Sequence, residues 1–387
     1  MKILLIGNYA DDHQESMLRY AGMLEGALKE RGHEVRLVQP PVVFGQLVST
    51  HSPLKKWLGY IDKLLLFPRQ LRRRAAWADI VHICDHSNAV YSIAVSNRPS
   101  VVTCHDLLAI RGALGEFPEN NTGWSGRIYQ ALIRRGLRKS PVIVCDSYAT
   151  RQDVVRLIGK DRNDSRVVYL GLNYPYHPME RNAVAQHLSK LGLSQDRDFL
   201  LHVGGNQWYK NRLGVLRIFK YLLNSPGASH LHLVLAGKPW TVEMRNYVRE
   251  HGIESRVTEL PGVSNEELRA LYSTTKGLLF PSLCEGYGWP VLEAQACGSP
   301  VFTSNRAPMN EIGGSCAVYI DPQDPVQAAQ CVAEALASAR GGGEAAIRNA
   351  GRFTLEQMTN EYIAIYQDIL DASDRVPANA KSRKSAT

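Results

Sequence analysis

The sequence predicts an α/β protein built from two doubly wound domains, each a parallel sheet covered by helices. Short apolar runs alternate with helical stretches along most of the chain, which is typical of βαβ units. Two series of such units follow each other, the first from "KILLIGN" and the second from "DFLLHVGG". The chain of 387 residues also exceeds the usual size of a single hydrophobic core.

The first series starts with the buried strand "KILLIGN" and continues with the helical stretch "SMLRYAGMLEGALKERGHEV". Gly32 ends this helix, and its apolar face is formed by Met17, Tyr20, Ala21, Leu24 and Leu28. Further strands are predicted at "EVRLVQP", "DIVHICD", "PSVVTCHD" and "SPVIVCDS". Because ligands bind at the carboxyl edge of open parallel sheets, the polar residues that end these strands indicate a site there.

The second series has six predicted strands, namely "DFLLHVGG", "HLHLVLAGK", "RVTELPG", "KGLLFPS", "SPVFTSN" and "CAVYIDP". The proline-rich junction "LGLNYPYHPME" interrupts the periodicity between the two series. We therefore predict an N-terminal domain over residues 1–178 and a C-terminal domain over 179–352. The polar segment 373–387 is predicted to be a disordered tail.

Composition indicates a protein of the cytoplasm. Hydrophobic residues make up 44% and charged residues 21%, as in ordinary globular proteins, and no apolar run approaches the roughly 18 residues of a membrane span. The first residues do not have the pattern of a signal peptide. The seven cysteines are scattered without metal-binding spacing, so we expect free thiols, mostly in the core, and no metal site.

The positive charge of the chain is confined to its first half. Residues 1–178 contain 24 Lys/Arg and 16 Asp/Glu, whereas residues 179–387 contain 21 of each, so the net charge of +8 belongs to the first series alone. This asymmetry predicts a basic surface facing anionic lipid or a phosphorylated substrate. Nucleic acid is not an expected partner, because no recognition module accompanies the basic clusters.

The stretch "PSLCEGYGWPVLEA" places two glutamates around a strand-to-helix turn. Pro290 suits the first turn of a helix, and Gly286 and Gly288 allow the backbone to bend and approach a ligand. The N–H groups at the helix start favour an anion. We expect Glu285 in the loop and Glu293 in the first helical turn, one on each side of a sugar–diphosphate–nucleoside. A solvated Glu285 and a dipole-stabilising Glu293 remain the alternative.

The segment "CEGYGWPVLEA" resembles the E-x7-E motif of the family-4 retaining glycosyltransferases, which have the GT-B fold of two Rossmann-like domains facing across a cleft. "LLHVGGNQWYKN", "GVSNEELRALYSTTKGLLFPSLCEGYG", "VTCHDL" and "VCDSYATRQDV" resemble other segments of that family, so the similarity covers most of residues 1–370. It implies an acceptor-binding first domain, a donor-binding second domain and a last helix, at about 354–370, that returns to the first.

The resemblance also implies the roles of individual residues. His105, Lys210 and Glu285 take the catalytic positions: His105 lines the cleft, Lys210 pairs with the diphosphate and Glu285 contacts hydroxyls of the transferred sugar. Glu293 binds the ribose hydroxyls. The implied donor-binding residues are Gly204, Gly205, Lys210, Gly262, Val263, Glu285, Gly286, Tyr287, Gly288, Trp289 and Glu293.

Two positions depart from the family pattern. Gly205 stands where the family usually has an arginine, and "ADDHQES" replaces the glycines often found in the first strand–helix loop. Compensation of the diphosphate charge is therefore expected to depend on Lys210 and the helix start.

A basic amphipathic stretch, "PLKKWLGYIDKLLLFPRQLRRRAAW", lies in the first domain. Its apolar residues recur at helical spacing, although Pro68 should break or kink the run. The stretch suits either an anionic membrane surface or a core-packed helix pair with a solvated basic face. The apolar residues are Leu54, Trp57, Leu58, Ile61, Leu64 or Leu65, and Leu71.

Three smaller patterns have structural interpretations. "SNEE" at Ser264 to Glu267 is a capping box. Asp106 suits a helix cap or a group that orients His105, rather than a nucleophile. The "DRD" of Asp196 to Asp198 imitates a metal-binding D-x-D, but it precedes a strand in the linker.

Together these observations predict a metal-independent, retaining hexosyltransferase without a cofactor. It would move a hexose from a nucleotide-diphosphate sugar to a hydroxyl of a glycan or lipid-linked acceptor in cell-surface polysaccharide synthesis. We expect it in the cytoplasm, peripherally on the inner face of the plasma membrane. A nucleotide-sugar 2-epimerase and a non-catalytic nucleotide-sugar-binding protein are the alternatives. A nicotinamide dehydrogenase is disfavoured, because no G-x-G-x-x-G follows the first strand.

Overall fold

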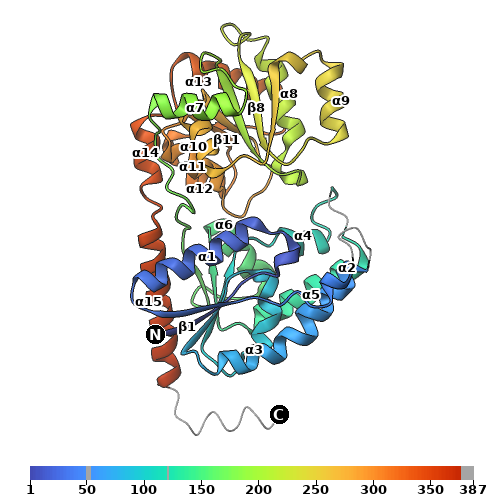
Figure 1. Cartoon of the computed structure of the whole chain (residues 1–387), viewed down its shortest axis with the longest axis vertical. Helices are drawn as coiled ribbons and strands as arrows, with labels where there is room; N and C mark the ends of the chain where they lie inside the picture. Colours follow the sequence, from blue (N-terminus) through green and yellow to red (C-terminus); the bar gives the residue numbers. More distant parts are fainter. Residues whose placement is uncertain (49–53, 120–121, 376–387) are drawn as a thin grey trace. The chain divides into compact units, whose positions relative to one another are not determined.

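The computed structural model describes residues 1–48, 54–119 and 122–375. The chain forms two compact units. The N-terminal domain comprises Met1–Asn173 and the described residues from Leu355 onward, and the C-terminal domain comprises Tyr174–Thr354 (Figure 1). These limits differ by a few residues from the 1–178 and 179–352 of the sequence analysis.

The N-terminal domain is built on a six-stranded parallel sheet of order β2-β1-β3-β4-β5-β6. All five strands predicted for this domain are present, and their apolar runs are buried. The sixth strand was not predicted, because its three residues, "SRV", contain one apolar side chain. The strands are β1 Lys2–Ile6, β2 Glu34–Val38, β3 Ile80–Ile83, β4 Ser100–Cys104, β5 Val142–Cys145 and β6 Ser165–Val167.

Helices cover this sheet, and α1 shows why they form. Tyr20, Ala21, Leu24 and Leu28 of α1 are buried as the periodicity predicts, whereas Met17 is half-buried. Gly32, at φ 79°, provides the left-handed residue after the helix. The helices are α1 Glu15–Glu30, α2 Lys55–Ile61, α3 Phe67–Ala75, α4 Leu108–Ala113, α5 Trp124–Lys139, α6 Tyr148–Asp153 and α15 Leu355–Asp374.

The helix α15 belongs to the N-terminal domain although it ends the described chain. The Tyr362 hydroxyl lies 2.8 Å from Thr103 Oγ1, and the Tyr366 hydroxyl lies 2.6 Å from His82 Nδ1. Tyr20 also donates to the Tyr362 hydroxyl at 2.7 Å. Because α15 runs to Asp374, the predicted tail begins too early at 373, and residues 376–387 lie outside the described part.

The basic stretch of the N-terminal domain stays helical through Pro68. A π-helical segment, Asp62–Leu66, joins α2 to α3, and Pro68 lies in the first turn of α3. The α-helical hydrogen bonding is therefore interrupted just before Pro68, while the helical run continues. Leu71 is fully buried, as the core-packed alternative expects, whereas Leu54 and Trp57 are exposed, as the membrane-surface alternative expects.

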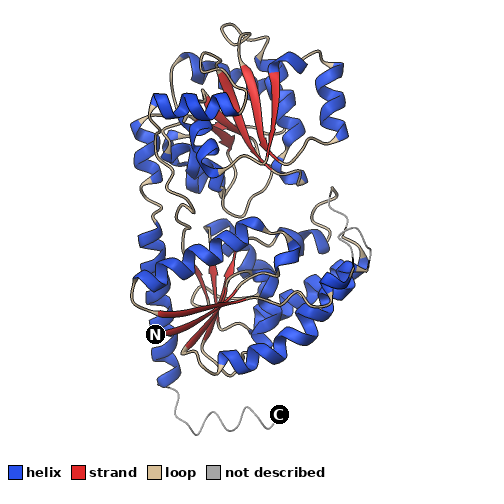
Figure 2. Cartoon of the chain, viewed as in Figure 1, coloured by secondary structure: helices blue, strands red, loops and turns tan. Residues whose placement is uncertain are grey.

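The C-terminal domain has a second six-stranded parallel sheet, of order β12-β11-β10-β7-β8-β9. All six strands predicted for it are present. In each domain the strands form a layer between helices (Figure 2). The strands are β7 Phe199–Gly204, β8 His232–Gly237, β9 Val257–Pro261, β10 Gly277–Phe280, β11 Val301–Ser304 and β12 Val318–Ile320.

The helices of the C-terminal domain pack their apolar faces on this sheet. In α8, Val215, Ile218, Phe219 and Leu222 are fully buried. The capping box predicted at Ser264 to Glu267 is confirmed at the start of α10. The helices are α7 Arg181–Lys190, α8 Arg212–Leu222, α9 Val242–Glu250, α10 Asn265–Thr274, α11 Trp289–Ala296, α12 Met309–Gly313, α13 Pro325–Ala337 and α14 Glu344–Ala350.

Candidate active site

The turn between β10 and α11 has the strand–loop–helix form that the sequence predicts. Gly288 precedes α11 with φ 107°, a left-handed conformation that side chains rarely adopt, and as a glycine it has no side chain to cap the helix. Pro290 lies in the first turn, as predicted. The backbone N–H groups of this turn suit an anion.

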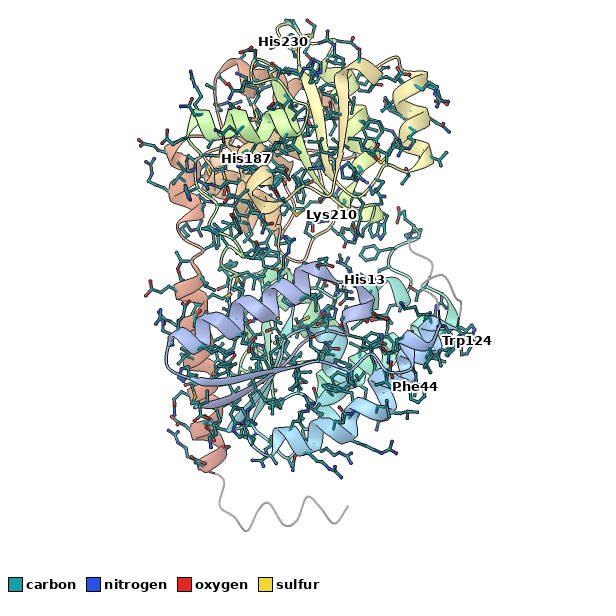
Figure 3. All side chains as sticks on the ribbon, in the orientation of Figure 1. His13, Phe44, Trp124, His187, Lys210 and His230 are labelled. Carbon is teal, nitrogen blue, oxygen red and sulfur yellow. The ribbon has the colours of Figure 1, made fainter. Side chains whose placement is uncertain are left out.

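Lys210 and Glu285 form an ion pair. Lys210 ends a 3-10 turn, Trp208–Lys210, between β7 and α8, and Glu285 lies in the loop before α11. Lys210 Nζ donates to Glu285 Oε1 at 2.8 Å and to Oε2 at 2.9 Å, and both side chains are largely buried. The structure thus brings two of the three predicted catalytic residues together. Figure 3 marks Lys210 at the carboxyl end of the C-terminal sheet, after β7.

Glu293 occupies a different position from the predicted one. Because α11 begins at Trp289, Glu293 lies in the second turn, and its assignment to the first turn was wrong. It is 6% exposed, and its Oε2 accepts a hydrogen bond from the Tyr272 hydroxyl at 2.9 Å. Burial and the nearby Glu293 carboxylate raise the pKa of Tyr272 well above its usual value, so the phenol stays a neutral donor.

The predicted donor-binding glycines follow the carboxyl ends of strands. A Cβ atom on Gly204 would lie 3.3 Å from His202 Nε2 and 3.6 Å from Lys210 Cδ, so a side chain there would crowd the His202 ring and contact the lysine. Gly205 directly follows β7, and Gly262, at φ 72°, directly follows β9. The remaining predicted residues lie in the loop after β9 or around the start of α11: Val263, Gly286, Tyr287 and Trp289.

His105 lies at the carboxyl end of β4 in the N-terminal domain and is 5% exposed. Its Nδ1 is 2.5 Å from Asp146 Oδ2, and its Nε2 donates to the Cys84 carbonyl at 2.8 Å. Burial lowers the pKa of His105, but the carboxylates of Asp146 and Asp85 and the hydrogen bonds raise it more, to about 9. His105 is therefore a buried imidazolium with both nitrogens bonded inside its domain.

Asp146 and Tyr272 were not identified from the sequence. Asp146 follows β5, and the polar ends of the strands were the one available signal for it. It, rather than Asp106, orients His105. Asp106 instead lies two residues before α4, and its Oδ1 accepts the N–H of Leu108, the first residue of that helix, at 2.9 Å.

The acidic loop after β1 is held by the basic stretch. Lys63 Nζ lies 2.9 Å from Asp12 Oδ2, and Lys55 Nζ lies 3.2 Å from Asp11 Oδ2. The loop that replaces the family's glycines therefore neutralises two of the basic residues that suggested a lipid surface.

No group of three or more His, Cys, Asp or Glu side chains in residues 1–48, 54–119 and 122–375 is arranged to hold a metal ion. Asp198, in the D-x-D imitation, pairs with Lys276 at 3.1 Å and His230 at 3.2 Å. In the same part of the chain, no helix is long and apolar enough to cross a bilayer. Of the seven cysteines, four are buried and three are partly exposed, and all are free thiols.

Both domains of the chain match glycosyltransferase families. Residues 17–174 match "Glycosyltransferase Family 4", and residues 185–352 match "Glycosyl transferases group 1". The chain is 26% identical over 335 residues to O-antigen chain mannosyltransferase B of Escherichia coli, covering 82% of this chain and 84% of that protein.

Two solved structures share the fold. Sucrose-phosphate synthase from Thermosynechococcus elongatus superposes with a TM-score of 0.75 at 18% identity, covering 96% of this chain and 100% of that one. Anabaena HepE, in complex with UDP and glucose, superposes with a TM-score of 0.72 at 15% identity, covering 95% and 100%.

Two Rossmann-like domains of this kind form the GT-B fold, which the two solved structures share, and the two family models identify the chain as a glycosyltransferase. The chain belongs to the family-4 glycosyltransferases, with a Family 4 domain at its N-terminal end and a group 1 domain after it.

Proposed function

We propose that this glycosyltransferase moves a hexose from a nucleotide-diphosphate sugar to a hydroxyl of a glycan or lipid-linked acceptor, with retention of the anomeric configuration and without a metal ion. The single observation that carries the proposal is the Lys210–Glu285 pair beside the start of α11. It puts a cation, a carboxylate and a helix N-terminus in one place, which is the chemistry a sugar–diphosphate requires.

The pair has to open when the donor binds. The diphosphate takes Lys210 and the N–H groups of α11, and Glu285 then accepts hydrogen bonds from sugar hydroxyls. In the transition state the bond between the anomeric carbon and the diphosphate breaks, and Lys210 stabilises the charge that develops on the leaving oxygen. Glu293 is the proposed partner of the ribose hydroxyls, with Tyr272 fixing its carboxylate.

Retention follows if the acceptor hydroxyl attacks on the face that the diphosphate leaves. The new bond forms between the acceptor oxygen and the anomeric carbon, and the hydroxyl proton passes to the departing phosphate. No protein nucleophile is needed. A protonated His105, with both nitrogens bonded, is not available to remove a proton, so the mechanism assigns it no role as a general base.

A panel of UDP-, GDP- and ADP-hexoses, each incubated with the enzyme and lipid-linked or oligosaccharide acceptors, tests the reaction. Product formation with the donor's anomeric configuration, read by NMR and unaffected by EDTA, is the expected result. An inverted product contradicts the mechanism. Epimerised nucleotide sugar without acceptor transfer supports the 2-epimerase, and donor binding without any turnover supports the non-catalytic alternative.

We also propose that the N-terminal domain lies on an anionic membrane surface. Trp124, Ile128 and Leu132 form an exposed apolar ridge along α5, spaced one helical turn apart, at 71%, 54% and 41% exposure. Tyr129 of α5 contacts Tyr60 of α2, with ring centroids 5.2 Å apart, so the exposed Trp57 belongs to a neighbouring helix. Figure 3 marks Trp124 at the outer end of α5.

Basic side chains are exposed on the same helix and on α2 and α3. Arg127, Arg135, Arg138 and Lys139 of α5 are exposed, as are Lys56 of α2 and Arg72, Arg73 and Arg74 of α3. Each basic side chain near an anionic bilayer contributes about 1 kcal/mol, and the apolar ridge adds burial in the interface.

Co-sedimentation with vesicles of phosphatidylglycerol or of phosphatidylcholine tests the surface. We expect binding to the anionic vesicles at low salt, and its loss in Trp124→Ser/Ile128→Ser and in Arg72→Ser/Arg73→Ser/Arg74→Ser. Val242→Ser, which changes a side chain of the C-terminal domain that is 75% exposed, is the matched control and should bind like wild type. Equal binding to both vesicle types, or none, contradicts the proposal.

A further inference from the structure

Arg212 is a buried cation that the site described above does not use. It is the first residue of α8 and is 4% exposed. Its Nη1 donates to the Lys238 carbonyl at 2.8 Å and to Asn206 Oδ1. Its Nε and Nη2 are also buried, and among the described residues neither has a hydrogen-bond partner. A native protein rarely leaves two such donors unused, because each one costs free energy.

The charge of Arg212 is also uncompensated. Within the part of the chain that the structure describes, no carboxylate forms an ion pair with it. The nearby Glu259 is directed elsewhere, because it accepts the N–H of Trp240 at 2.6 Å and pairs with Arg245 at 3.2 Å. A buried guanidinium without a counter-charge is strongly unfavourable, which indicates that an anion binds here in the functional state.

Arg212 lies next to the proposed phosphate site. One residue, Asn211, separates it from Lys210, and both cations are near His202 at the carboxyl end of β7. Burial, together with the positive charges of Arg212 and Lys210, lowers the pKa of His202 to about 3. The imidazole is therefore neutral and does not compensate either charge. The charges of both cations thus act on one neutral ring, in a site where Gly205 leaves out the arginine usual in the family.

The two unused donors have a geometry that matches phosphate. Nε and Nη2 lie on the same edge of a guanidinium, and an arginine uses such an edge to bind two oxygens of one phosphate group. Nη1, on another edge, already holds the loops that follow β7 and β8 through Asn206 and Lys238. Arg212 can therefore bind an anion without giving up those contacts.

We propose that Arg212 is a second diphosphate-binding residue, which takes the place of the arginine that Gly205 lacks. This role rests on the proposed function, since the anion is the diphosphate of the donor. Lys210 and Arg212 then bind the diphosphate together. The lysine contributes a point charge, and the arginine donates two hydrogen bonds to one phosphate group through Nε and Nη2. Because Nε and Nη2 are buried, the atoms that cover them must shift when the donor enters.

Calorimetric titration tests this with UDP, GDP, ADP, the three parent nucleosides and inorganic pyrophosphate. We expect Arg212→Gln to weaken the preferred diphosphate about tenfold or more, the range of a lost charge-assisted hydrogen bond, and to leave nucleoside affinity unchanged. The affinity for pyrophosphate should weaken in parallel. The diphosphate affinity of Arg212→Lys should lie between those of wild type and Arg212→Gln. Arg217→Gln, an exposed arginine on the same helix, is the matched control.

The outcomes separate this role from the function on which it rests. Wild-type protein that binds none of the diphosphates refutes the proposed function and this role with it. Wild-type protein that binds one, with Arg212→Gln binding it equally, refutes only the role of Arg212. If Arg212→Gln loses nucleoside and diphosphate affinity in parallel and has a lower Tm, then Arg212 only holds the loops after β7 and β8 in place, and the proposed phosphate contact is refuted. Should Arg212→Gln not fold, an unchanged diphosphate affinity in Arg212→Lys overturns the proposal.

Discussion

The carboxyl ends of the two sheets carry cations in opposite electrostatic situations. In the N-terminal domain, His105 is bonded to Asp146 and the Cys84 carbonyl, so its charge is fully compensated within the domain. In the C-terminal domain, Lys210 has one carboxylate partner, Glu285, and Arg212 has no ion pair among the described residues. The first arrangement stabilises the fold, whereas the second is prepared for an anion that the chain does not supply.

This difference has a physical consequence for each domain. A compensated buried pair gains little from an added ligand, and breaking it leaves an uncompensated charge. An excess of buried positive charge is relieved by ligand, so binding should stabilise the C-terminal domain. Substitutions in one domain at a time should therefore have different effects.

The largest effect is expected for Asp146→Asn, which removes the counter-charge of His105. The pKa of His105 in the folded protein, about 9, lies above its ordinary 6.5, so the pair contributes stability fully below pH 6.5 and loses it as the pH rises through 9. The variant should lose on the order of 3 kcal/mol of unfolding free energy at pH 6 and much less at pH 10.

Urea unfolding of wild type and variant at pH 6 and pH 10 measures this difference. Asp106→Asn is the matched control, because Asp106 accepts a backbone N–H rather than bonding to His105, and its cost should vary little over the same range. A cost of Asp146→Asn that is equal at both pH values would show that the imidazolium does not depend on Asp146.

Lys210→Ala should lose at least about 2 kcal/mol of transition-state stabilisation, measured as a lower kcat/KM. This is the scale for removing one preorganised donor to a developing charge. The variant also leaves Glu285 buried without its cation, so some stability should be lost. Lys276→Ala, an exposed lysine of the same domain, serves as control and should keep wild-type kinetics. Activity within twofold of wild type in Lys210→Ala would remove the lysine from the mechanism.

The two glutamates should respond differently to replacement by glutamine. Glu293→Gln should mainly weaken nucleotide binding, by about 1 kcal/mol, because the Tyr272 hydroxyl then holds a neutral acceptor. Glu285→Gln should mainly lower kcat, because it acts on the transferred sugar. Steady-state kinetics combined with nucleotide titration distinguishes the two, and wild-type behaviour in both variants would mean that the site is elsewhere.

The smallest effect is expected for Gly205→Arg, which restores the usual arginine. A Cβ atom at Gly205 would lie 2.5 Å from Gln207 Oε1, the end of a flexible side chain that can rotate away. Diphosphate affinity should rise a few-fold, about 0.5–1 kcal/mol. Calorimetry measures it, with Gly205→Ser as control for the added Cβ. A weaker diphosphate affinity in Gly205→Arg than in Gly205→Ser would show that position 205 does not face the phosphates.

The strands were predictable because a strand of a parallel sheet is buried on both faces and therefore apolar throughout, as in "KILLI" and the core of "FLLHVG". The strand "SRV" was missed for the same reason, since it has too few apolar residues to be recognised. Gly286, Gly288 and Pro290 indicated the start of α11. The helix begins directly after the left-handed Gly288, so Glu293 lies in its second turn and not in the predicted first turn.

The partners of the site residues could not be predicted. Asp146 is 41 positions from His105, and Tyr272 is 21 positions from Glu293, so no local pattern joins them. The unused donors of Arg212 depend on where the loops after β7 and β8 lie in space. Sequence patterns therefore indicated which residue types are in the site, and the fold determines which of them are compensated.

The return of α15 to the first domain has a consequence for synthesis. Tyr362 and Tyr366 supply the hydroxyl partners of Thr103 and His82, which are buried in the N-terminal sheet. While the chain emerges from the ribosome, Thr103 and His82 can bond to each other but lack these two tyrosine hydroxyls until α15 has been made. The C-terminal domain, which is continuous in sequence from Tyr174 to Thr354, has all of its residues before the N-terminal domain does. The domain that is translated first is therefore the one that finishes folding last.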